Sequence, residues 1–271
     1  MRPSLRYLVS AVAATVIAVT TCLAPRLTYA EDSSVSKPTV ILVHGAFAES
    51  SSWNRVIAKL LPKGYKVVAV ANPLRGVKTD AAYLSSVINS VGGPVILVGH
   101  SYGGSVITEA ATGKGNVKAL IYVSGLAPDS GETASALVGK FPGSTLGPTL
   151  AAPVLLADGS KDLYILQDKF HAQFCADLPA GEAKLMAATQ RPIVEAAFNE
   201  AGGVPAWKTI PSWFLYASLD KNIPPAVHAF MAKRAGAKKI VEIKGASHVV
   251  MMSHPDALVS LIDDASADTA P

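Results

Sequence analysis

A serine at residue 101 stands in the motif Gly-His-Ser-Tyr-Gly-Gly, residues 99–104, between an apolar run and a helical pattern. The run 94–98, PVILV, predicts a buried strand, and the residues from Val106 onward predict a helix. Glycine at positions 99 and 103 lets such a strand and helix approach closely, because glycine has no Cβ atom. A serine in this strand–turn–helix context has an exposed hydroxyl, so Ser101 is a candidate nucleophile. The alternative interpretation is an ordinary glycine-rich turn of an α/β protein.

A nucleophilic serine needs a general base, and six histidines are available. In this context an acidic residue and then the histidine follow the serine along the chain, which excludes His44 and His100. His248 follows the predicted strand 239–243 and the turn 245–247, where the base belongs. The remaining three lie in or beside helical patterns: His171, His228 and His254. We therefore expect His248 to be the base.

The acid that orients the base is expected in the loop after a late strand. Residues 213–217, WFLYA, predict that strand, and Asp220 lies in the loop that follows it. The alternative role of Asp220 is to cap the helix that begins near Pro224. Asp162, in the loop 158–162, is the rival, but it follows no clear strand. We favour Asp220 as the acid.

The early apolar run 40–43 predicts another buried strand, and His44 follows it directly. A tetrahedral intermediate needs two backbone N–H donors aimed at its oxyanion. Tyr102, the residue after the nucleophile, is expected to supply one donor, and Ala46 in the loop after the early strand the other. His44 is then a structural residue that holds this loop. We also expect Phe47 and Tyr102 to face a substrate.

Strands and helices alternate along most of the chain, which predicts an α/β fold. The predicted strands are 39–43, 65–71, 94–98, 117–123, 213–217 and 239–243, and the predicted helices are 52–61, 80–91, 103–113, 225–234 and 255–264. Because the strands are Val, Ile and Leu runs without alternation, we expect a mostly parallel sheet of about six strands with helices on both faces. An insertion over about 125–207 breaks the alternation with Pro and Gly, and with helical patterns near 168–178, 180–189 and 192–201.

Taken together, these motifs resemble the α/β-hydrolase superfamily over about residues 38–266. More narrowly, the chain resembles small, lid-bearing bacterial esterases related to plant methyl esterases and hydroxynitrile lyases. The matching segments are 44–46 with Trp53 downstream, 99–104, 220–224 and 243–248. The resemblance implies an α/β-hydrolase fold, a catalytic triad of Ser101, Asp220 and His248, an oxyanion hole at Ala46 and Tyr102, and a helical cap formed by the insertion 125–207.

This resemblance predicts hydrolysis of a small-molecule carboxylic ester through an acyl-enzyme on Ser101. The lyases of the group carry a threonine after the first strand and a lysine after the catalytic histidine, whereas this chain has Gly45 and Val249. Two alternatives stay open. One is a carbon–carbon hydrolase or lyase with the same triad, and the other is a non-catalytic small-molecule-binding protein on this scaffold.

The first thirty residues have the pattern of a secretory signal peptide. A start with Arg2 and Arg6 is followed by the apolar run 8–23, and the segment ends at Ala30. We expect cleavage after Ala30 and an exported protein, periplasmic or secreted, with an α/β-hydrolase domain over residues 31–271. After cleavage we expect no stable membrane association, and an uncleaved anchor is the alternative.

Removal of this segment takes away three arginines and leaves 21 basic against 20 acidic residues. A nearly neutral chain without a Lys/Arg run lacks the electrostatic footprint of a nucleic-acid-binding protein. His171 and Cys175 are four residues apart, as two metal ligands on a helix can be, but the sequence shows no two further ligands for them. No glycine-rich phosphate loop is present. We therefore expect neither a metal nor a cofactor, and the sequence predicts no oligomeric state.

Overall fold

The computed structural model describes residues 37–270. The predicted signal peptide, residues 1–30, and the predicted cleavage site after Ala30 therefore lie outside the described residues.

Six strands form a sheet in which every neighbouring pair is parallel. They are β1 (Thr39–Val43), β2 (Val67–Val70), β3 (Val95–His100), β4 (Val117–Val123), β8 (Ser212–Ala217) and β9 (Lys239–Ile243), in the order β2-β1-β3-β4-β8-β9. Side chains of the central strands β1, β3 and β8 are buried throughout, since helices cover both faces of the sheet. The predicted parallel sheet of six strands is confirmed.

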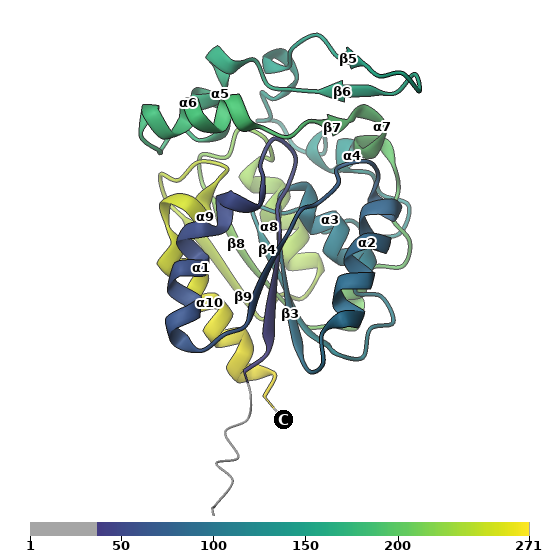
Figure 1. Ribbon diagram of the computed structural model, residues 1–271, viewed down its shortest axis with the longest axis vertical. Helices are drawn as coiled ribbons and strands as arrows, with labels where there is room; N and C mark the ends of the chain where they lie inside the picture. Colours follow the sequence, from purple (N-terminus) through teal and green to yellow (C-terminus); the bar gives the residue numbers. More distant parts are fainter. Residues whose placement is uncertain (1–36, 271) are drawn as a thin grey trace, which may run out of the picture. The chain divides into compact units, whose positions relative to one another are not determined.

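Helices pack on both faces of this sheet (Figure 1). On one side lie α1 (Asn54–Leu60), α9 (Val250–Ser253) and α10 (Pro255–Asp268), and on the other lie α2 (Val77–Ser90) and α3 (Tyr102–Ala110), with α8 (Pro225–Arg234) beside β8. Short 3₁₀ helices, η1 (Ser50–Trp53) and η2 (Leu61–Lys63), flank α1. This arrangement leaves the carboxyl ends of the strands free of sheet-covering helices, and in α/β sheets that edge is where ligands bind.

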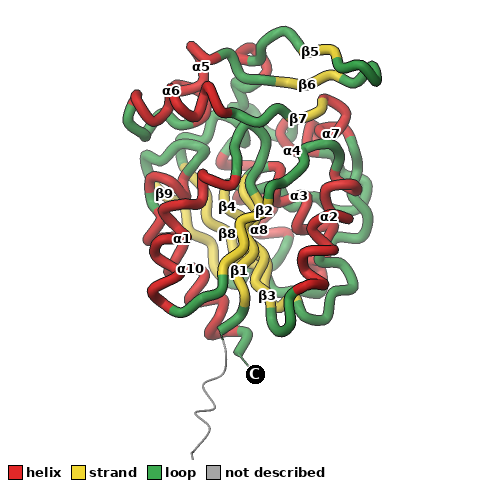
Figure 2. The backbone as a smooth tube through the Cα atoms, in the orientation of Figure 1, coloured by secondary structure: helices red, strands yellow, loops and turns green. Residues whose placement is uncertain are grey.

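The segment between β4 and β8 lies across the carboxyl edge of the sheet (Figure 2). It contains the helices α4 (Ala134–Val138), α5 (Gln167–Phe174), α6 (Ala180–Thr189) and α7 (Glu195–Asn199), the strands β5 (Val154–Leu155), β6 (Lys161–Leu163) and β7 (Ile193–Val194), and the 3₁₀ helices η3 (Gly147–Thr149) and η4 (Ala206–Lys208). We call this segment the cap. Its strands form a small antiparallel sheet in the order β5-β6-β7, which the sequence analysis did not predict.

The helix predicted over 192–201 is wrong at its start. Ile193 and Val194 form β7 and pair with β6, and the helix α7 begins only at Glu195. Both residues of β7 are buried and β-branched, so pairing with a neighbouring strand outweighs the helical pattern. Such a partner strand is visible only in three dimensions.

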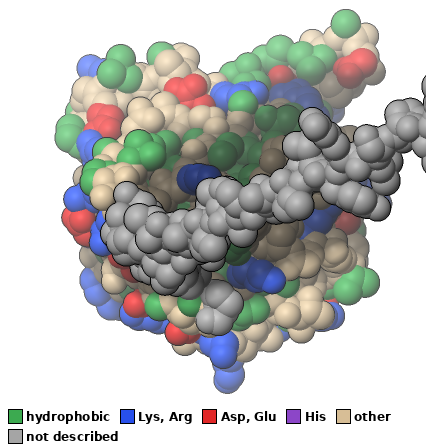
Figure 3. All heavy atoms as spheres, turned by 60° about the horizontal axis from the view of Figure 1, so that its bottom comes forward, with side chains coloured by type: hydrophobic (Ala, Val, Ile, Leu, Met, Phe, Trp, Pro, Cys, Tyr) green, Lys and Arg blue, Asp and Glu red, His purple; other side chains and the backbone are tan. Residues whose placement is uncertain are grey.

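Figure 3 shows one face of the molecule, on which Lys and Arg side chains are interspersed with Asp and Glu. A mixed surface of this kind matches the small net charge expected from the sequence. Among the residues that the structure describes, no helix is both long enough and apolar enough to span a membrane.

Candidate active site

Ser101 lies where β3 ends and α3 begins. Its backbone has φ 53° and ψ −125°, a conformation that a residue with a side chain rarely adopts. Three hydrogen bonds hold it there: its N–H donates to the Val123 carbonyl at 3.3 Å, and its carbonyl accepts from the N–H groups of Gly104 and Leu126 at 3.0 Å each. The sharp strand-to-helix turn predicted around Ser101 is therefore present and firmly held.

The glycines around Ser101 are required by close packing. A Cβ atom on Gly99 would lie 2.6 Å from the Gly103 carbonyl oxygen, and one on Gly103 would collide with the Val43 carbonyl oxygen. Strand β1, strand β3 and helix α3 thus meet at distances that only glycine permits. The close approach predicted from glycine at 99 and 103 is confirmed.

Asp220 and His248 are joined behind this turn. Asp220 follows β8 and His248 follows β9, and the Asp220 Oδ2 atom lies 2.7 Å from His248 Nδ1. The other oxygen of Asp220 accepts the N–H groups of Asn222 at 2.8 Å and Ile223 at 3.0 Å. Burial alone would raise the pKa of Asp220, but the charge and hydrogen bonds of His248 and His228 hold it below its ordinary value. Asp220 is therefore an ionised acceptor for the His248 ring.

Ser101 and His248 line the same small cavity, of about 30 Å³, together with Ala46, Phe47 and Tyr102. The Nε2 atom of His248 is buried and has no hydrogen-bond partner among residues 37–270. Within the same described range, the N–H groups of Ala46 and Tyr102 donate to no protein acceptor. The residues predicted as nucleophile, base and oxyanion donors therefore line one cavity.

The side chains of Phe47 and Tyr102 differ in their surroundings. Phe47 has φ 61° and packs edge-on against Phe174 of the cap, with ring centroids 6.3 Å apart. Its own N–H donates to the Arg191 carbonyl at 3.0 Å, so this loop is tied to the cap. Tyr102 is buried, and its hydroxyl donates to Asp80 Oδ2 at 3.0 Å. That burial and the charge of Asp80 raise the pKa of the Tyr102 phenol well above its usual range.

His44 has the structural role expected of it. It is fully buried, its Nε2 accepts the N–H of Asn72 at 3.1 Å, and its carbonyl accepts the Asn72 side-chain amide at 2.9 Å. Burial lowers the pKa of His44 to about 4, so the ring is neutral at pH 7. His100 is also buried, and burial followed by the charge of His248 lowers its pKa. Neither ring lines the cavity at Ser101.

The rival acid Asp162 lies elsewhere. It is part of β6 in the cap, not of a loop, and its Oδ1 pairs with Arg75 Nη1 at 2.6 Å. No histidine is among its hydrogen-bond partners in the part of the chain that the structure describes. Its position therefore gives it a role in attaching the cap to the loop before α2.

One residue that contacts Asp220 was not among the site residues predicted from the sequence. His228, in α8, is fully buried, and its Nε2 lies 3.2 Å from the same Asp220 Oδ2 atom that contacts His248. The sequence placed His228 in a helical pattern, which is correct, but gave no sign of which way the ring points. Its spacing of eight residues from Asp220 is the only available hint.

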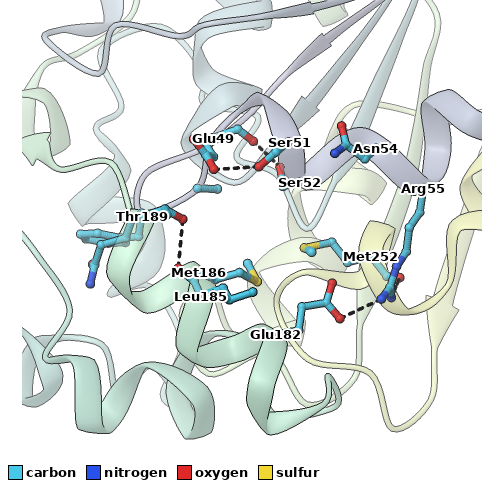
Figure 4. A pocket seen from close by; sticks show the side chains of 13 residues that line it. Glu49, Ser51, Ser52, Asn54, Arg55, Glu182, Leu185, Met186, Thr189 and Met252 are labelled. Carbon is cyan, nitrogen blue, oxygen red and sulfur yellow. Dashed lines mark hydrogen bonds and ion pairs between the residues drawn. The ribbon is translucent and has the colours of Figure 1, made fainter.

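Phe47 also lines a larger cavity, of about 410 Å³. Figure 4 shows this larger cavity from close by. Its walls come from η1, α1 and Met252 on one side and from α6 of the cap on the other. An ion pair between Arg55 and Glu182, with 2.7 Å between nitrogen and oxygen, bridges the two walls. Met186 and Leu185 give the α6 wall an apolar surface.

Comparison with known proteins places the chain among related enzymes. Residues 40–261 match the model of the alpha/beta hydrolase family. An α/β hydrolase of Aspergillus novofumigatus is 27% identical over 253 residues, covering 86% of this chain and 98% of the relative. The alpha-hydroxynitrile lyase of Arabidopsis thaliana is 25% identical over 254 residues, covering 84% and 96%.

A solved structure, polyneuridine aldehyde esterase, superimposes with a TM-score of 0.72 at 18% identity, covering 85% of this chain and 99% of that one. At this identity the likeness establishes the fold, and the family match extends across the sheet, the cap and all the site loops. The chain therefore belongs to the alpha/beta hydrolase family and has esterase-like relatives.

Proposed function

We propose that the protein is an exported serine hydrolase that cleaves carboxylic esters of small molecules through an acyl-enzyme on Ser101. The observation that carries this proposal is the hydrogen bond of 2.7 Å between Asp220 and His248, which leaves His248 Nε2 unpaired at the cavity that Ser101 lines. A buried carboxylate that contacts a histidine, at a cavity that a serine also lines, supports nucleophilic catalysis by that serine.

In the proposed reaction the Ser101 hydroxyl attacks the ester carbonyl, and His248 Nε2 takes the hydroxyl proton. The same nitrogen then delivers this proton to the alcohol as the carbonyl–oxygen bond breaks. Asp220 keeps the other proton of His248 on Nδ1 and stabilises the ring when it is charged. The N–H groups of Ala46 and Tyr102 bind the oxyanion, and water releases the acid from the serine by the same steps.

Two positions favour hydrolysis over a lyase reaction. A Cβ atom on Gly45 would lie 2.5 Å from the Ser101 Cβ atom, so the threonine of the resembling lyases has no room at this position. Val249, which stands in the place of their lysine, is buried and uncharged. A cyanide leaving group would therefore meet no cation from this position.

The two cavities support esters with short to medium apolar groups. The space at Ser101 admits only a small group, and Phe47 lines both this space and the larger cavity beside α6. A longer substrate group would enter this larger cavity, where each buried methylene contributes about 0.8 kcal/mol until the space is filled. Turnover should thus rise with chain length and then fall.

Labelling by a serine-directed fluorophosphonate tests the proposal. The wild type should be labelled, Ser101→Ala should not, and Ser105→Ala is the matched control, because Ser105 is a buried serine of α3 whose hydroxyl has no partner in the described structure. Absence of labelling in the wild type would favour a binding protein. Specificity constants for p-nitrophenyl esters from acetate to palmitate then test chain length, and a maximum at palmitate with interfacial activation would indicate a lipase.

Export rests on the signal-peptide pattern alone. The intact mass of the exported protein should correspond to a chain that begins at Glu31. A retained Met1, or a lipid on Cys22, would contradict cleavage after Ala30.

A further inference from the structure

The carboxylate of Asp220 accepts four hydrogen bonds. A Ser-His-Asp arrangement needs only the bond from the catalytic histidine, and two backbone N–H groups bring the number to three. The fourth donor is therefore additional. Oδ1 accepts two backbone N–H groups from its own loop. Oδ2 faces two imidazole rings, with His248 Nδ1 at 2.7 Å and His228 Nε2 at 3.2 Å. All three side chains are almost completely buried, so water does not compete for these contacts.

The His228 ring is held in a fixed orientation. It stacks on Tyr216 of β8, with ring centroids 5.3 Å apart and planes 20° apart. An ionised carboxylate only accepts hydrogen bonds, so the proton of the contact belongs to His228 Nε2. Its Nδ1 atom is buried and has no partner within residues 37–270. The only hydrogen bond that the His228 side chain makes in this part of the chain is therefore the one to Asp220.

We infer that His228 is a positioning residue that acts on the candidate base through Asp220. The inference rests on the proposed function, in which His248 accepts the proton of Ser101. A second donor on Oδ2 fixes the direction of the Asp220–His248 hydrogen bond and withdraws part of the negative charge that stabilises a protonated His248. His228 thereby holds Asp220 and, through it, the His248 ring in one orientation, and weakens the negative charge that Asp220 presents to that ring.

Few other titratable groups face this pair. The His100 ring lies 4.7 Å from the His248 ring and donates toward the His248 carbonyl, at 3.2 Å. On the His228 side the stacked Tyr216 phenol is the neighbour. Asp177 accepts a hydrogen bond from Ser247, the residue before His248. None of these groups contacts Asp220 Oδ2 in the described structure, so removal of His228 leaves His248 as the one side-chain donor there.

His228→Phe tests this inference, because it keeps a ring to stack on Tyr216 and removes the donor. With p-nitrophenyl acetate we expect kcat to fall about 10- to 100-fold with KM within about a factor of three, since the base is misplaced and not the substrate. The midpoint of the acidic limb of kcat/KM against pH should move up by about half a pH unit. His228→Gln, whose amide can donate to Asp220, should recover most of kcat.

Tyr216→Leu is the matched control, because it removes the stacking partner and leaves the donor. It should lower the melting temperature without moving the acidic midpoint. If His228→Phe retains the wild-type kcat and midpoint, or if Tyr216→Leu moves the midpoint equally, His228 is only a packing residue. Should His228→Phe fail to fold, His228→Leu, which also removes the donor, takes its place: a midpoint that rises in His228→Leu but not in His228→Gln or Tyr216→Leu supports the inference, and equal midpoints in all three variants overturn it.

A second measurement separates this inference from the proposed function. The proton on His248 Nδ1 gives a strongly downfield NMR resonance when it is hydrogen-bonded to a carboxylate. Removal of the second donor should move this resonance further downfield, because the Asp220 oxygen becomes a stronger acceptor. This shift is expected even in a protein that hydrolyses no ester and takes no fluorophosphonate label, and an unchanged resonance in His228→Phe would overturn the inference.

Discussion

The strand ends that hold Ser101 and the cap above them are built in opposite ways. Around Ser101 the backbone of three elements meets so closely that Gly99 and Gly103 admit no side chain, and every residue of β3 is buried. In the cap the strands β5 and β7 have two residues each, and Leu155 of β5 is 71% exposed. The first region is thus packed backbone against backbone, whereas part of the cap consists of short strands with an exposed side chain.

This difference separates chemistry from selectivity. The polar groups of the candidate site come from loops at the carboxyl ends of the sheet strands: β1, β3, β8 and β9. The cap supplies only apolar side chains to the small cavity: Leu126, Val138, Leu146, Phe174 and Phe198. Changes in the sheet loops should therefore alter the rate for every substrate, and changes in the cap should alter which substrate fits.

Ser101→Ala should cause the largest loss of activity among changes in the loops at the carboxyl ends of the sheet strands. Ester hydrolysis should fall by roughly four to six orders of magnitude in a folded protein, because the three triad groups act as a unit. Steady-state kinetics with a p-nitrophenyl ester, together with a thermal melt, provide the measurement. Near-normal turnover would remove Ser101 from the proposed mechanism.

The two candidate acids, Asp220 in a sheet loop and Asp162 in the cap, allow a direct comparison of the two regions. Asp220→Asn should lower kcat by about four orders of magnitude, since the amide favours the wrong tautomer of His248. Asp162→Asn breaks an ion pair with Arg75, which is 40% exposed, and should change kcat less than about threefold. A reversed ranking of the two variants in kcat would move the acid into the cap.

Replacing one glycine in each region by alanine compares how tightly the two regions are packed. Gly103→Ala drives a Cβ atom into the Val43 carbonyl and should lower the free energy of unfolding by about 1–3 kcal/mol or more. Gly181→Ala, on α6, meets nothing within 4 Å and should raise it by about 0.4–1 kcal/mol. Urea unfolding measures both, and equal losses would mean that the cap is packed as tightly as the sheet.

The buried His44 makes the sheet side sensitive to acid. Its pKa is 6.5 when unfolded and about 4 when folded, so the unfolded chain binds the proton first as the pH falls through this window. His44 alone should remove roughly 3 kcal/mol of stability between these limits. In His44→Asn, urea unfolding should show lower stability at pH 7 but a flatter decline toward pH 4. A slope equal to that of the wild type would contradict the pKa assigned to His44, while His100, whose pKa is also lowered, accounts for a remaining slope.

Much of the sheet side was predictable because its signals are local. A buried parallel strand needs an apolar run, a turn of φ 53° against packed backbone needs flanking glycines, and the loop after such a strand is the place for a polar side chain. These rules gave the boundaries of β1 and β9 to the residue, and the strands after which Ser101, Asp220 and His248 were expected are present. The cap offered no such rules: its short strands are defined by pairing partners, and the pattern over 192–201 suggested helix where β7 forms.

By itself the sequence determined the parallel sheet of six strands, the turn at Ser101 and the order of the candidate triad residues, because each depends on neighbours within a few positions. Only the tertiary structure decided that Asp220 and not Asp162 contacts His248, and that Phe47 lines two cavities. It also decided that His228 turns toward Asp220. These outcomes depend on how a helix rotates about its axis and on how distant loops meet, and both are set by the packing of the whole domain.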